Sequence, residues 1–438
     1  MSHRGSRVLR VGSLARVEGE GSLHLRVTGR EVEEAQLRIY EPPRFFEAFL
    51  RGRAHTEPPD ITARVCGICP VAYQMSACRA IEDACGVSVD HPVRELRRLL
   101  YCGEWIESHA LHIYLLHAPD FLGCDSAVDL ARTERAAVER GLRLKQAGNA
   151  ILELLGGRAI HPVNVRLGGF HRVPAGAELR PLEERLRRAA DDAWETVRLV
   201  AGFDFPDASF DADFLALASP TTYAVEDGTP AVLRTDGGRA RFPVSAFLDH
   251  VREEQVPHST ALHSRLDGRR HLTGPLARYA IGGHRLSPTA REAAREAGLG
   301  TVCRNPYRSV LVRAVEVVHA VDEALRIIAA YEPPARPHVD VPPRQGTGHG
   351  ATEAPRGLLY HRYRLDAEGT VTDACLVPPT AQNQGAIEDD LVRTVERVFA
   401  EGDPTDAELT RLCERAIRNH DPCISCSAHF LDLTIDRS

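Results

Sequence analysis

The sequence predicts a mainly α-helical (α+β) fold: a bundle of long helices around a buried metal site, with small mixed or antiparallel sheets at the periphery. Three observations predict this fold. Helical periodicity recurs over much of the chain, strand-type residues gather in the first forty residues, and two C-x-x-C motifs lie near opposite ends. A chain of 438 residues can bury a sizeable core. We expect one large domain over residues 1–429, with a β portion at about 7–40, a mixed middle at about 204–285, and a tail at 430–438.

The first expected elements are strands. The runs LHLRV (23–27) and EAQLRIY (34–40) carry β-type residues on either side of a turn at 28–30. After Pro43, the run RFFEAFLRG predicts a short amphipathic helix. Two prolines, Pro58 and Pro59, then predict a break in the secondary structure before the first cysteine motif.

Long helices follow these elements. Residues 91–117 carry a long helical pattern that opens at Asp90-His91-Pro92, where proline suits the first turn. Further helices are expected at 127–155, 178–202, 309–331, 385–401 and 405–419. The Pro- and Gly-rich stretch 332–350 predicts an extended loop or a partner-facing arm.

Composition and charge argue against several classes of protein. The formal net charge of −7 is unlike that of a nucleic-acid or anionic-membrane binder, which needs a basic face. The first residues lack the apolar run of a secretory signal, and no window approaches eighteen uninterrupted apolar residues. We therefore expect a cytoplasmic protein that binds neither nucleic acid nor membrane. Metal or redox use of some of the eleven cysteines is then more plausible than disulfides.

The two C-x-x-C motifs are the strongest chemical signal. RVCGICP contains Cys66 and Cys69, and DPCISC contains Cys423 and Cys426. The i, i+3 spacing lets two thiolates converge on one metal ion, and four thiolates suit zinc, iron or nickel. Because more than 350 residues separate the pairs, we expect the site at the heart of a large domain.

Three other uses of these cysteines were weighed. A structural zinc site usually closes a small module, a thioredoxin-like pair leaves the second motif unexplained, and a cubane cluster would have an odd ligand pattern. The remaining cysteines that we expect to be small buried apolar residues are 78, 85, 102, 124, 303 and 413. His109 and His112 could chelate a metal, but these two and His117 are more plausibly hydrogen-bonding core residues.

The residues around the cysteines resemble the large (catalytic, alpha) subunits of nickel–iron hydrogenases from about residue 8 to 429. The segments that carry the resemblance are RVCGICPVAYQMSA, DPCISCSAHF, RVEGEG (16–21), EAPRG (353–357), GGRAIHPVNVRLGG (156–169), SHALHIYLLHAPD (108–120) and CLVPPTAQN (375–383). The stretch EPPRFFEAFLRGR most resembles the soluble cytoplasmic, NADP-linked group called sulfhydrogenases. The resemblance implies reversible oxidation of dihydrogen on the hydrogenase large-subunit fold.

The resemblance also implies a role for each cysteine. Cys66 and Cys423 would be terminal nickel ligands, while Cys69 and Cys426 would bridge nickel to an iron that carries carbonyl and cyanide groups. Soft thiolates suit nickel, and a nickel-bound thiolate can accept the proton left by heterolytic cleavage of dihydrogen. Glu18 would be the proton-relay residue. Without the resemblance, a lone glutamate here predicts only an exposed carboxylate in a turn, and the neighbouring Glu20 is an alternative relay.

Further residues are implied around that centre. Arg356 would hold a guanidinium over the metals, with Asp120 and Asp421 as its acids, or it is simply a buried arginine in an ion pair. Glu47, His429 and the backbone carbonyl of Cys375 would hold magnesium or a similar ion. Only the resemblance implies this ion site, since Glu47 by itself is a polar residue on an amphipathic helix.

The sequence departs from the family pattern at three places. Tyr73 stands where many relatives carry a histidine hydrogen-bonded to the bridging sulfur, so that role does not transfer. Pro379 replaces a residue that offers a hydroxyl to cyanide, and Thr380 is the substitute donor. Residues 430–438 follow the position where a maturation protease cuts many relatives, and we expect this tail to be removed.

No further iron–sulfur ligand set is evident in the chain, so the electrons need partner subunits. We expect an iron–sulfur small subunit, followed by flavin (FAD) and NADP diaphorase subunits that lead to NADP(+)/NAD(+) or sulfur. The alternatives are a hydrogen-sensing regulatory subunit, a complex I-like non-hydrogenase homologue, and a zinc-stabilised scaffold. All four cysteines are present, which argues against the complex I-like class.

Overall fold

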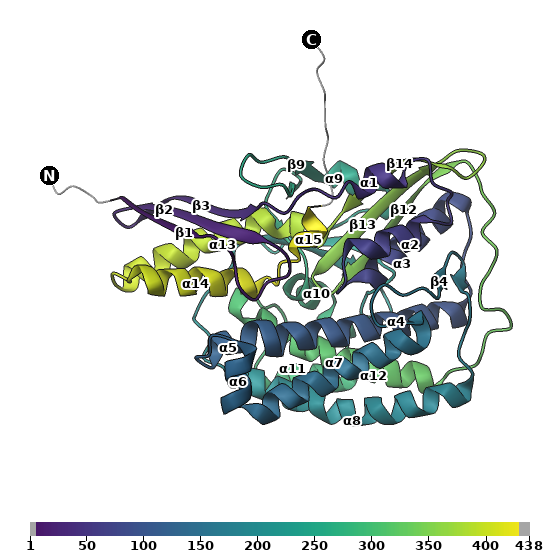
Figure 1. Ribbon diagram of the computed structural model, residues 1–438, viewed down its shortest axis with the longest axis horizontal. Coiled ribbons are helices and arrows are strands. Elements are labelled where there is room, and N and C mark those ends of the chain that lie inside the picture. Colours follow the sequence, from purple (N-terminus) through teal and green to yellow (C-terminus); the bar gives the residue numbers. More distant parts are fainter. Residues whose placement is uncertain (1–5, 429–438) are drawn as a thin grey trace, which may run out of the picture.

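Four long helices form the lower layer of the molecule (Figure 1). They are α4 (His91–Ala110), α7 (Arg135–Gly156), α8 (Gly176–Ala201) and α12 (Ser309–Ala329) in this computed structural model, which describes residues 6–428. Helix α12 is buried almost all round and packs against both α4 and α8, as expected of a helix in the centre of a bundle. Helix α8 instead buries one stripe that includes Leu179, Leu182 and Leu186. The predicted mainly helical fold is confirmed.

Two of the expected helices are interrupted. The pattern at 91–117 forms α4, a π-helical stretch η2 (Leu111–His117) and the short helix α5 (Ala118–Phe121). The pattern at 127–155 divides at Glu134 into α6 (Ala127–Thr133) and α7. A π-helical turn inserts an extra residue into the helix and rotates the side chains that follow it. Here it reorients the segment that contains His112 and His117.

The N-terminal strands lie beside the C-terminal helices (Figure 1). The antiparallel strands β1 (Ser6–Val11), β2 (Gly21–Thr28) and β3 (Glu31–Ile39) pack against α13 (Pro379–Glu401) and α14 (Asp406–Asn419). Leucines of the sheet, such as Leu25 and Leu37, share a core cluster with Leu391 and Ile417 of the helices. This packing places the N-terminal loop beside the C-terminal cysteine motif.

A second layered unit holds the first cysteine motif. Helices α1 (Phe46–Leu50), α2 (Pro58–Thr62) and α3 (Pro70–Cys85), with the turn η1 (Ala63–Val65), lie beside the antiparallel strands β12 (Gly346–Ala354), β13 (Gly357–Leu365) and β14 (Val371–Val377). Helix α3 lies directly on β12 because that strand presents glycines. A Cβ at Gly348 would lie 1.9 Å from the carbonyl oxygen of Ala80, and a Cβ at Gly350 would lie 2.4 Å from that of Ser76.

The middle of the chain is mixed. Its four-stranded sheet has the order β11-β6-β7-β8, and a hairpin forms from β9 and β10. The strands are β6 (Asp213–Ala218), β7 (Thr229–Leu233), β8 (Arg239–Arg241), β9 (Val251–Glu254), β10 (His263–Leu266) and β11 (His271–Leu272). The helices and turns among and after them are η3 (Val244–Ala246), α9 (Phe247–His250), α10 (Pro275–Gly282), η4 (Gly283–Arg285), α11 (Pro288–Glu296) and η5 (Pro306–Arg308).

The Pro- and Gly-rich stretch packs against its own chain. The amide of Val339 donates to the carbonyl of Gly168 at 3.1 Å, and the amide of Phe170 donates to Pro337 at 2.9 Å. Gly168 joins the small hairpin β4 (Val165–Arg166) and β5 (Gly169–Phe170). The extended loop predicted at 332–350 is confirmed for residues 332–345 and wrong for 346–350, which begin β12. Residues 337–339 cover the hairpin and do not form a free arm.

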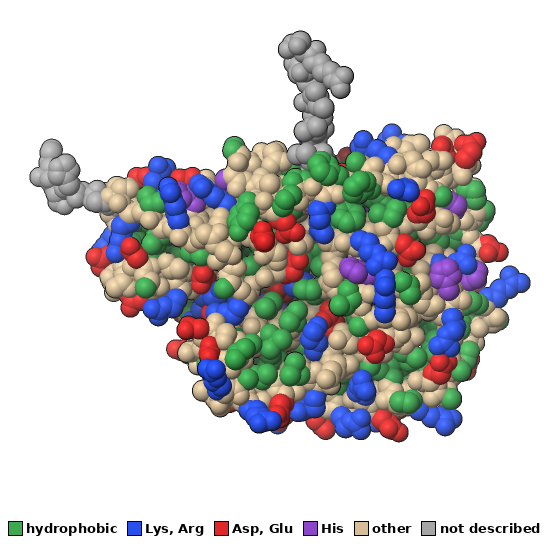
Figure 2. Space-filling view, in the orientation of Figure 1, with side chains coloured by type: hydrophobic (Ala, Val, Ile, Leu, Met, Phe, Trp, Pro, Cys, Tyr) green, Lys and Arg blue, Asp and Glu red, His purple; other side chains and the backbone are tan. Residues whose placement is uncertain are grey.

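The surface mixes charges of both signs. Figure 2 shows basic and acidic side chains interspersed over one face, with apolar patches between them. Phe45 and Phe49 are among the exposed large apolar side chains, at 41% and 55% of full exposure. Within residues 6–428, no helix is both long enough and apolar enough to span a membrane.

Candidate metal centre

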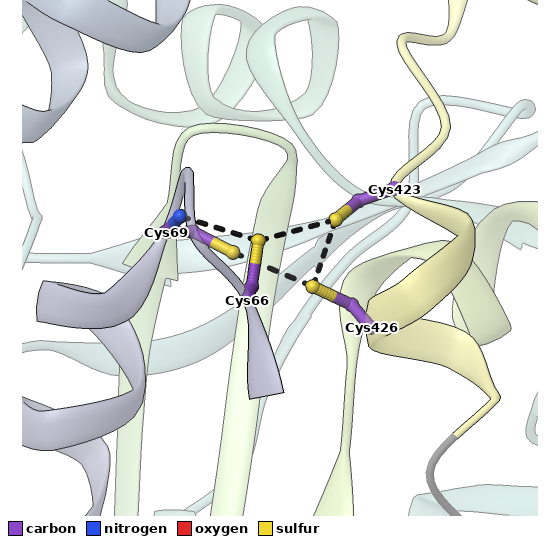
Figure 3. Close-up of side chains that lie close together, drawn as sticks. All are labelled: Cys66, Cys69, Cys423 and Cys426. Atoms are coloured by element: carbon purple, nitrogen blue, oxygen red, sulfur yellow. Dashed lines mark hydrogen bonds between the residues drawn. The ribbon is translucent and has the colours of Figure 1, made fainter. Parts of the chain in front are cut away.

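The four cysteines of the two motifs meet in the interior (Figure 3). Cys66 follows η1, Cys69 is the residue before α3, and Cys423 and Cys426 flank the start of the short helix α15 (Ile424–Ser427). The sulfurs of Cys66 and Cys423 are 3.5 Å apart, and those of Cys69 and Cys426 are 3.4 Å apart. All four side chains are buried, with at most 3% exposure. Each motif thus supplies one sulfur to each facing pair.

Buried polar residues hold the two motifs in place. Glu104 of α4 accepts the amide of Val71 at 2.6 Å and that of Ala72 at 3.2 Å, which satisfies free N–H groups at the start of α3. Burial raises the pKa of this carboxyl well above its usual range. Arg44 donates to the carbonyl of Val65 at 2.6 Å and also to that of Ser425, so one guanidinium joins both motifs.

The donor set fits a soft metal centre. The sulfurs of Cys423 and Cys426 are 2.8 Å apart, and all four ligand atoms lie within 4.8 Å of one another. Hydrogen bonding, first from Cys423, lowers the pKa of the Cys66 thiol, whereas burial raises the pKa of Cys423. Four crowded sulfurs in a dry interior favour thiolates shared by a cation, and thiolate is a good ligand for nickel and iron.

Glu18 contacts this centre directly. Its Oε2 accepts from the sulfur of Cys423 at 3.0 Å and from the amide of Ser425 at 3.1 Å. The carbonyl of Glu18 also accepts the amide of Ile424 at 3.0 Å, in a short parallel bridge between the two ends of the chain. Glu20 is exposed and its amide faces Glu41, so the carboxylate at the sulfur belongs to Glu18.

Arg356 is a buried cation beside the sulfurs. Its Nε and Nη2 donate to the carbonyl and to Oδ1 of Asp421, each at 3.1 Å. Nη1 has no hydrogen-bond partner among the described residues. Burial alone would lower the pKa of Arg356, but Asp421 and the thiols of Cys423, Cys69 and Cys66 raise it overall. A guanidinium left one donor short is suited to an anionic group that is not part of the protein.

Asp120 has different partners from those that the resemblance implies. Its oxygens accept from Arg418 at 2.7 and 2.8 Å, from Arg16 at 2.6 Å and from His117 at 3.1 Å. Although burial alone would raise it, hydrogen bonds from His117 and Arg418 hold the pKa of Asp120 below its usual range. Among the described contacts, only Asp421 pairs with Arg356. Two arginines saturate Asp120, which keeps it in a separate network linking α5, α14 and the N-terminal loop.

Two hydroxyls lie near the sulfurs. Oγ1 of Thr380 accepts the amide of Cys423 at 2.9 Å, which leaves its own proton free to donate elsewhere. The hydroxyl of Tyr73 is fully buried and has no hydrogen-bond partner within the described part of the chain. Burial raises the pKa of Tyr73 well above its usual range, and the thiol of Cys426 is the next largest cause. Tyr73 therefore stays a neutral donor near the centre.

A second carboxylate, that of the partly exposed Glu253, is close enough to Glu47 for their charges to interact. Oε1 of Glu47 accepts the amide of Leu376 at 2.7 Å, directly after Cys375 on β14. Burial raises the pKa of Glu47 to about 7, and burial together with Glu47 raises the pKa of Glu253 to about 8. Two carboxylates whose charges repel each other suit a hard cation. His429 lies outside the described residues.

The histidines of the π-helical region are hydrogen-bonded core residues. His109 lies 2.9 Å from Glu316, His112 lies 2.8 Å from the carbonyl of Arg418, and His117 bridges Asp120 and Asn419. In residues 6–428 they do not converge on one point as metal ligands do. Of the remaining cysteines expected to be buried, Cys124 alone is partly exposed.

Sequence reasoning missed Glu104, Arg44, Glu253 and Arg16. Each reaches the site only through tertiary packing and lies outside the cysteine motifs. Arg16 could have been noticed, because it begins the RVEGEG segment that contains Glu18. Arg44 lies in the quoted segment EPPRFFEAFLRGR, whereas Glu104 and Glu253 have no local signal.

Comparison with known proteins agrees with this geometry. The nickel-dependent hydrogenase family matches residues 44–146 and 264–429. The alpha subunits of sulfhydrogenases 2 and 1 of Pyrococcus furiosus are each 33% identical to this chain; the alignments cover 97% of it and 100% and 98% of those subunits. The structure of an NAD+-reducing [NiFe]-hydrogenase aligns over 97% of this chain and 99% of its own, with 27% identity and a TM-score of 0.88.

A buried centre of four thiols on this helical fold defines a nickel-dependent hydrogenase, and the chain belongs to that family. More narrowly, it is the catalytic large subunit of a nickel–iron hydrogenase of the sulfhydrogenase type. The family and the enzyme class predicted from the sequence are confirmed.

Proposed function

We propose that this chain cleaves and forms dihydrogen reversibly at a nickel–iron centre held by its four central cysteines. Cys66 and Cys423 would hold nickel as terminal ligands, and Cys69 and Cys426 would hold both nickel and an iron with carbonyl and cyanide groups. The observation that carries the proposal is the arrangement of the sulfurs in two facing pairs, Cys66 with Cys423 and Cys69 with Cys426. This pairing agrees with the division into terminal and bridging cysteines that the resemblance implies, and so supports the proposal.

The metals supply the polarisation of dihydrogen, and the protein handles the proton. The sulfur of Cys423 is the base nearest to a carboxylate, because Glu18 lies 3.0 Å from it. Glu18 is only partly buried, so a proton passed from Cys423 to its Oε2 leaves the dry interior in one step. The amide of Ser425 orients that oxygen. Glu18 is therefore the proposed proton relay.

Arg356 and Thr380 would complete the surroundings of the metals. The free Nη1 of Arg356 offers a preorganised positive charge, and Asp421 fixes the plane of the guanidinium. The hydroxyl proton of Thr380 is available for a cyanide ligand, since its oxygen already accepts the amide of Cys423. Asp120, clamped by Arg418, would position α14 and hence the start of the DPCISC segment.

A magnesium-like ion would lie next to the centre. Glu47, the carbonyl of Cys375 and His429 are the proposed ligands. The raised pKa values of Glu47 and Glu253 support the proposal, because a divalent cation would relieve the repulsion between two buried carboxylates. Glu253 would act through water or directly as a further oxygen ligand.

The electrons would leave through an iron–sulfur small subunit. The exposed Gly67 lies between Cys66 and Cys69, and the apolar side chains of Ile160 and Val163 nearby are 57% and 47% exposed. Apolar exposure beside the buried sulfurs suits a partner that docks there. Flavin (FAD) and NADP subunits, or sulfur, would then take the electrons in the cytoplasm, and a protease would remove residues 430–438.

Infrared spectroscopy of the purified complex tests this function. We expect bands from metal-bound carbonyl and cyanide, together with one nickel for each large subunit by elemental analysis. A Cys426→Ser variant should lose the bands, whereas Cys413→Ser, at a buried cysteine remote from the centre, should keep them. Zinc in place of nickel, with no such bands in the wild type, would refute the proposal.

A further inference from the structure

A second group of metal-ligating side chains lies outside the four-cysteine centre. His258 is in the loop between β9 and β10, His263 begins β10, and Glu388 is on α13. Their ligand atoms all lie within 4.8 Å of one another. They are the only such group besides the four cysteines within residues 6–428.

The distances are close to those of a metal site. Nε2 of His258 lies 2.8 Å from Oε1 of Glu388, and Nδ1 of His263 lies 4.0 Å from Oε2. The two imidazole rings are nearly perpendicular, with centroids 5.5 Å apart. Ligands about 2.0–2.2 Å from a tetrahedral zinc ion are about 3.3 Å from one another. Small side-chain rotations would therefore bring all three ligands onto one ion.

The ring of His263 lacks the partners that a buried imidazole needs. The 4.0 Å separation from Glu388 is too long for a hydrogen bond, and Nε2 has no partner among the described residues. Its side chain is only 4% exposed. A neutral imidazole without a hydrogen-bond partner can offer a ring nitrogen to a metal ion.

The surrounding charges permit a cation. Two arginines act on His263, but each also faces a carboxylate: Arg265 lies 2.8 Å from Glu254, and Arg270 lies 3.2 Å from Asp389. Glu388 carries the negative charge of the site itself. It also accepts the amide of Leu37 at 3.1 Å, which fixes the carboxylate to the N-terminal sheet.

We propose that His258, His263 and Glu388 bind a divalent transition-metal ion, zinc above all. Two imidazoles and one carboxylate are a common ligand set for zinc and leave one of four positions open. That position faces outward, because His258 is 17% exposed and lines a shallow surface pocket of about 570 Å³ with Gln36, Arg38 and Pro257. Water fills the fourth position.

The ion would fasten the β9–β10 hairpin to α13 beside the C-terminal cysteine motif. The amide and the hydroxyl of Thr260 in this hairpin donate to the carbonyls of Ile39 and Glu41, each at 2.8 Å. The adjacent Ala261 packs in one apolar cluster with Ile39 and Ile424, the residue after Cys423. Zinc at the site would therefore stabilise the apolar cluster of Ile39, Ala261 and Ile424 that packs against the C-terminal cysteine motif.

Zinc binding to the purified nickel-loaded enzyme tests the proposal. After treatment with a chelator, the protein is titrated with zinc against a chromophoric competitor, and zinc X-ray absorption is measured. We expect one zinc with nitrogen and oxygen neighbours at about 2.0–2.2 Å, and a thermal midpoint that rises on binding. His258→Gln should weaken the affinity at least about tenfold. Because His258 lies at the surface, this variant should fold normally.

The controls separate this site from other zinc sites. His250→Gln changes a histidine on α9 that pairs with Asp267, and it should leave zinc binding unchanged. Glu388→Gln should lower the affinity as His258→Gln does. Sulfur neighbours at about 2.3 Å would place the zinc on cysteines and overturn the proposal. Absence of uptake, or equal uptake by the wild type and His258→Gln, would also overturn it.

Discussion

Arg356 has a guanidinium held on one side by Asp421 and left without a protein partner at Nη1. We expect Arg356→Lys to lower hydrogen oxidation by about 10²–10³-fold, because an ammonium cannot keep both the Asp421 pair and a donor over the metals. Dye-linked hydrogen uptake measures the activity, and nickel content with infrared bands verifies the centre. Arg326→Lys, at an exposed arginine on α12, is the control. Full activity in Arg356→Lys would remove this residue from the mechanism.

The role of Glu18 can be tested separately from electron transfer, because isotope exchange between dihydrogen and water measures proton transfer alone. Glu18→Gln keeps an oxygen for the amide of Ser425 but cannot carry a proton. We expect isotope exchange between dihydrogen and heavy water to fall by about 10²-fold or more, with the metals still in place. Glu20→Gln, a change to the exposed neighbour, should exchange normally. Normal exchange in Glu18→Gln would point to another proton path.

At the residue scale, motifs located the four cysteines and Glu18 because each of them lies in a short segment that resembles a segment of the family, although the segments are far apart in sequence. Motifs could not show the partners of Asp120, since Arg16 and Arg418 approach it from opposite ends of the chain. Glu253 was missed for the same reason. Glu253 becomes a candidate ion ligand only because the fold brings it close to Glu47, which is remote in sequence.

Between elements, the contact of α3 with β12 allows no side chain at two glycines. Gly350→Ala would place a methyl group 2.4 Å from the carbonyl of Ser76, so α3 must move. We expect a loss of about 1–3 kcal/mol or more in the free energy of unfolding, and lower nickel occupancy because Cys69 directly precedes α3. Gly12→Ala meets no atom within 4 Å and serves as the control. A Gly350→Ala protein as stable as this control would contradict the packing argument.

Strand β11 contains a histidine that makes stability depend on pH. Burial lowers the pKa of His271 to about 4, whereas the unfolded chain has the ordinary value of 6.5. The unfolded state therefore takes up a proton first, and stability falls as the pH drops from 6.5 toward 4. At pH 5 this histidine should cost about 2 kcal/mol relative to pH 7.5.

Urea unfolding at pH 7.5, 6 and 5 measures this effect. His271→Gln should show a smaller loss of stability over that range than the wild type, while His91→Gln, at an exposed position on α4, should match the wild type. Equal pH dependence in His271→Gln and the wild type would show that the ring is not held neutral by burial.

At the element scale, periodicity predicted α8, α12 and α14 within a few residues of their bounds. It missed α3, which buries nearly its whole circumference and so lacks an amphipathic pattern. It also missed β12, whose sequence GTGHGATEA is poor in β-branched residues. These two elements depend on tertiary contact with each other, because the glycines of β12 leave space for the backbone of α3.

For the whole molecule, the question is where the partner docks. Ile160→Glu would place a charge in the exposed apolar region beside Gly67. We expect the variant to lose its small subunit on size-exclusion chromatography, because a charge in an apolar interface must be desolvated. Leu142→Glu, at a 44% exposed leucine of α7, should leave the complex intact. A stable Ile160→Glu complex would place the interface elsewhere.

The single domain at 1–429 stays a prediction.

The division of the metal centre between two distant motifs has a consequence for the order of events during synthesis. Cys69 and Cys423 are 354 positions apart, and at about 5–20 residues per second a ribosome needs roughly 20–70 seconds to pass from one to the other. Throughout that interval the nascent chain offers only two of the four thiols of the centre, and two thiols bind metal weakly and without the geometry of the finished centre. Nickel delivered early would find half a ligand set, so loading belongs after translation of the second motif.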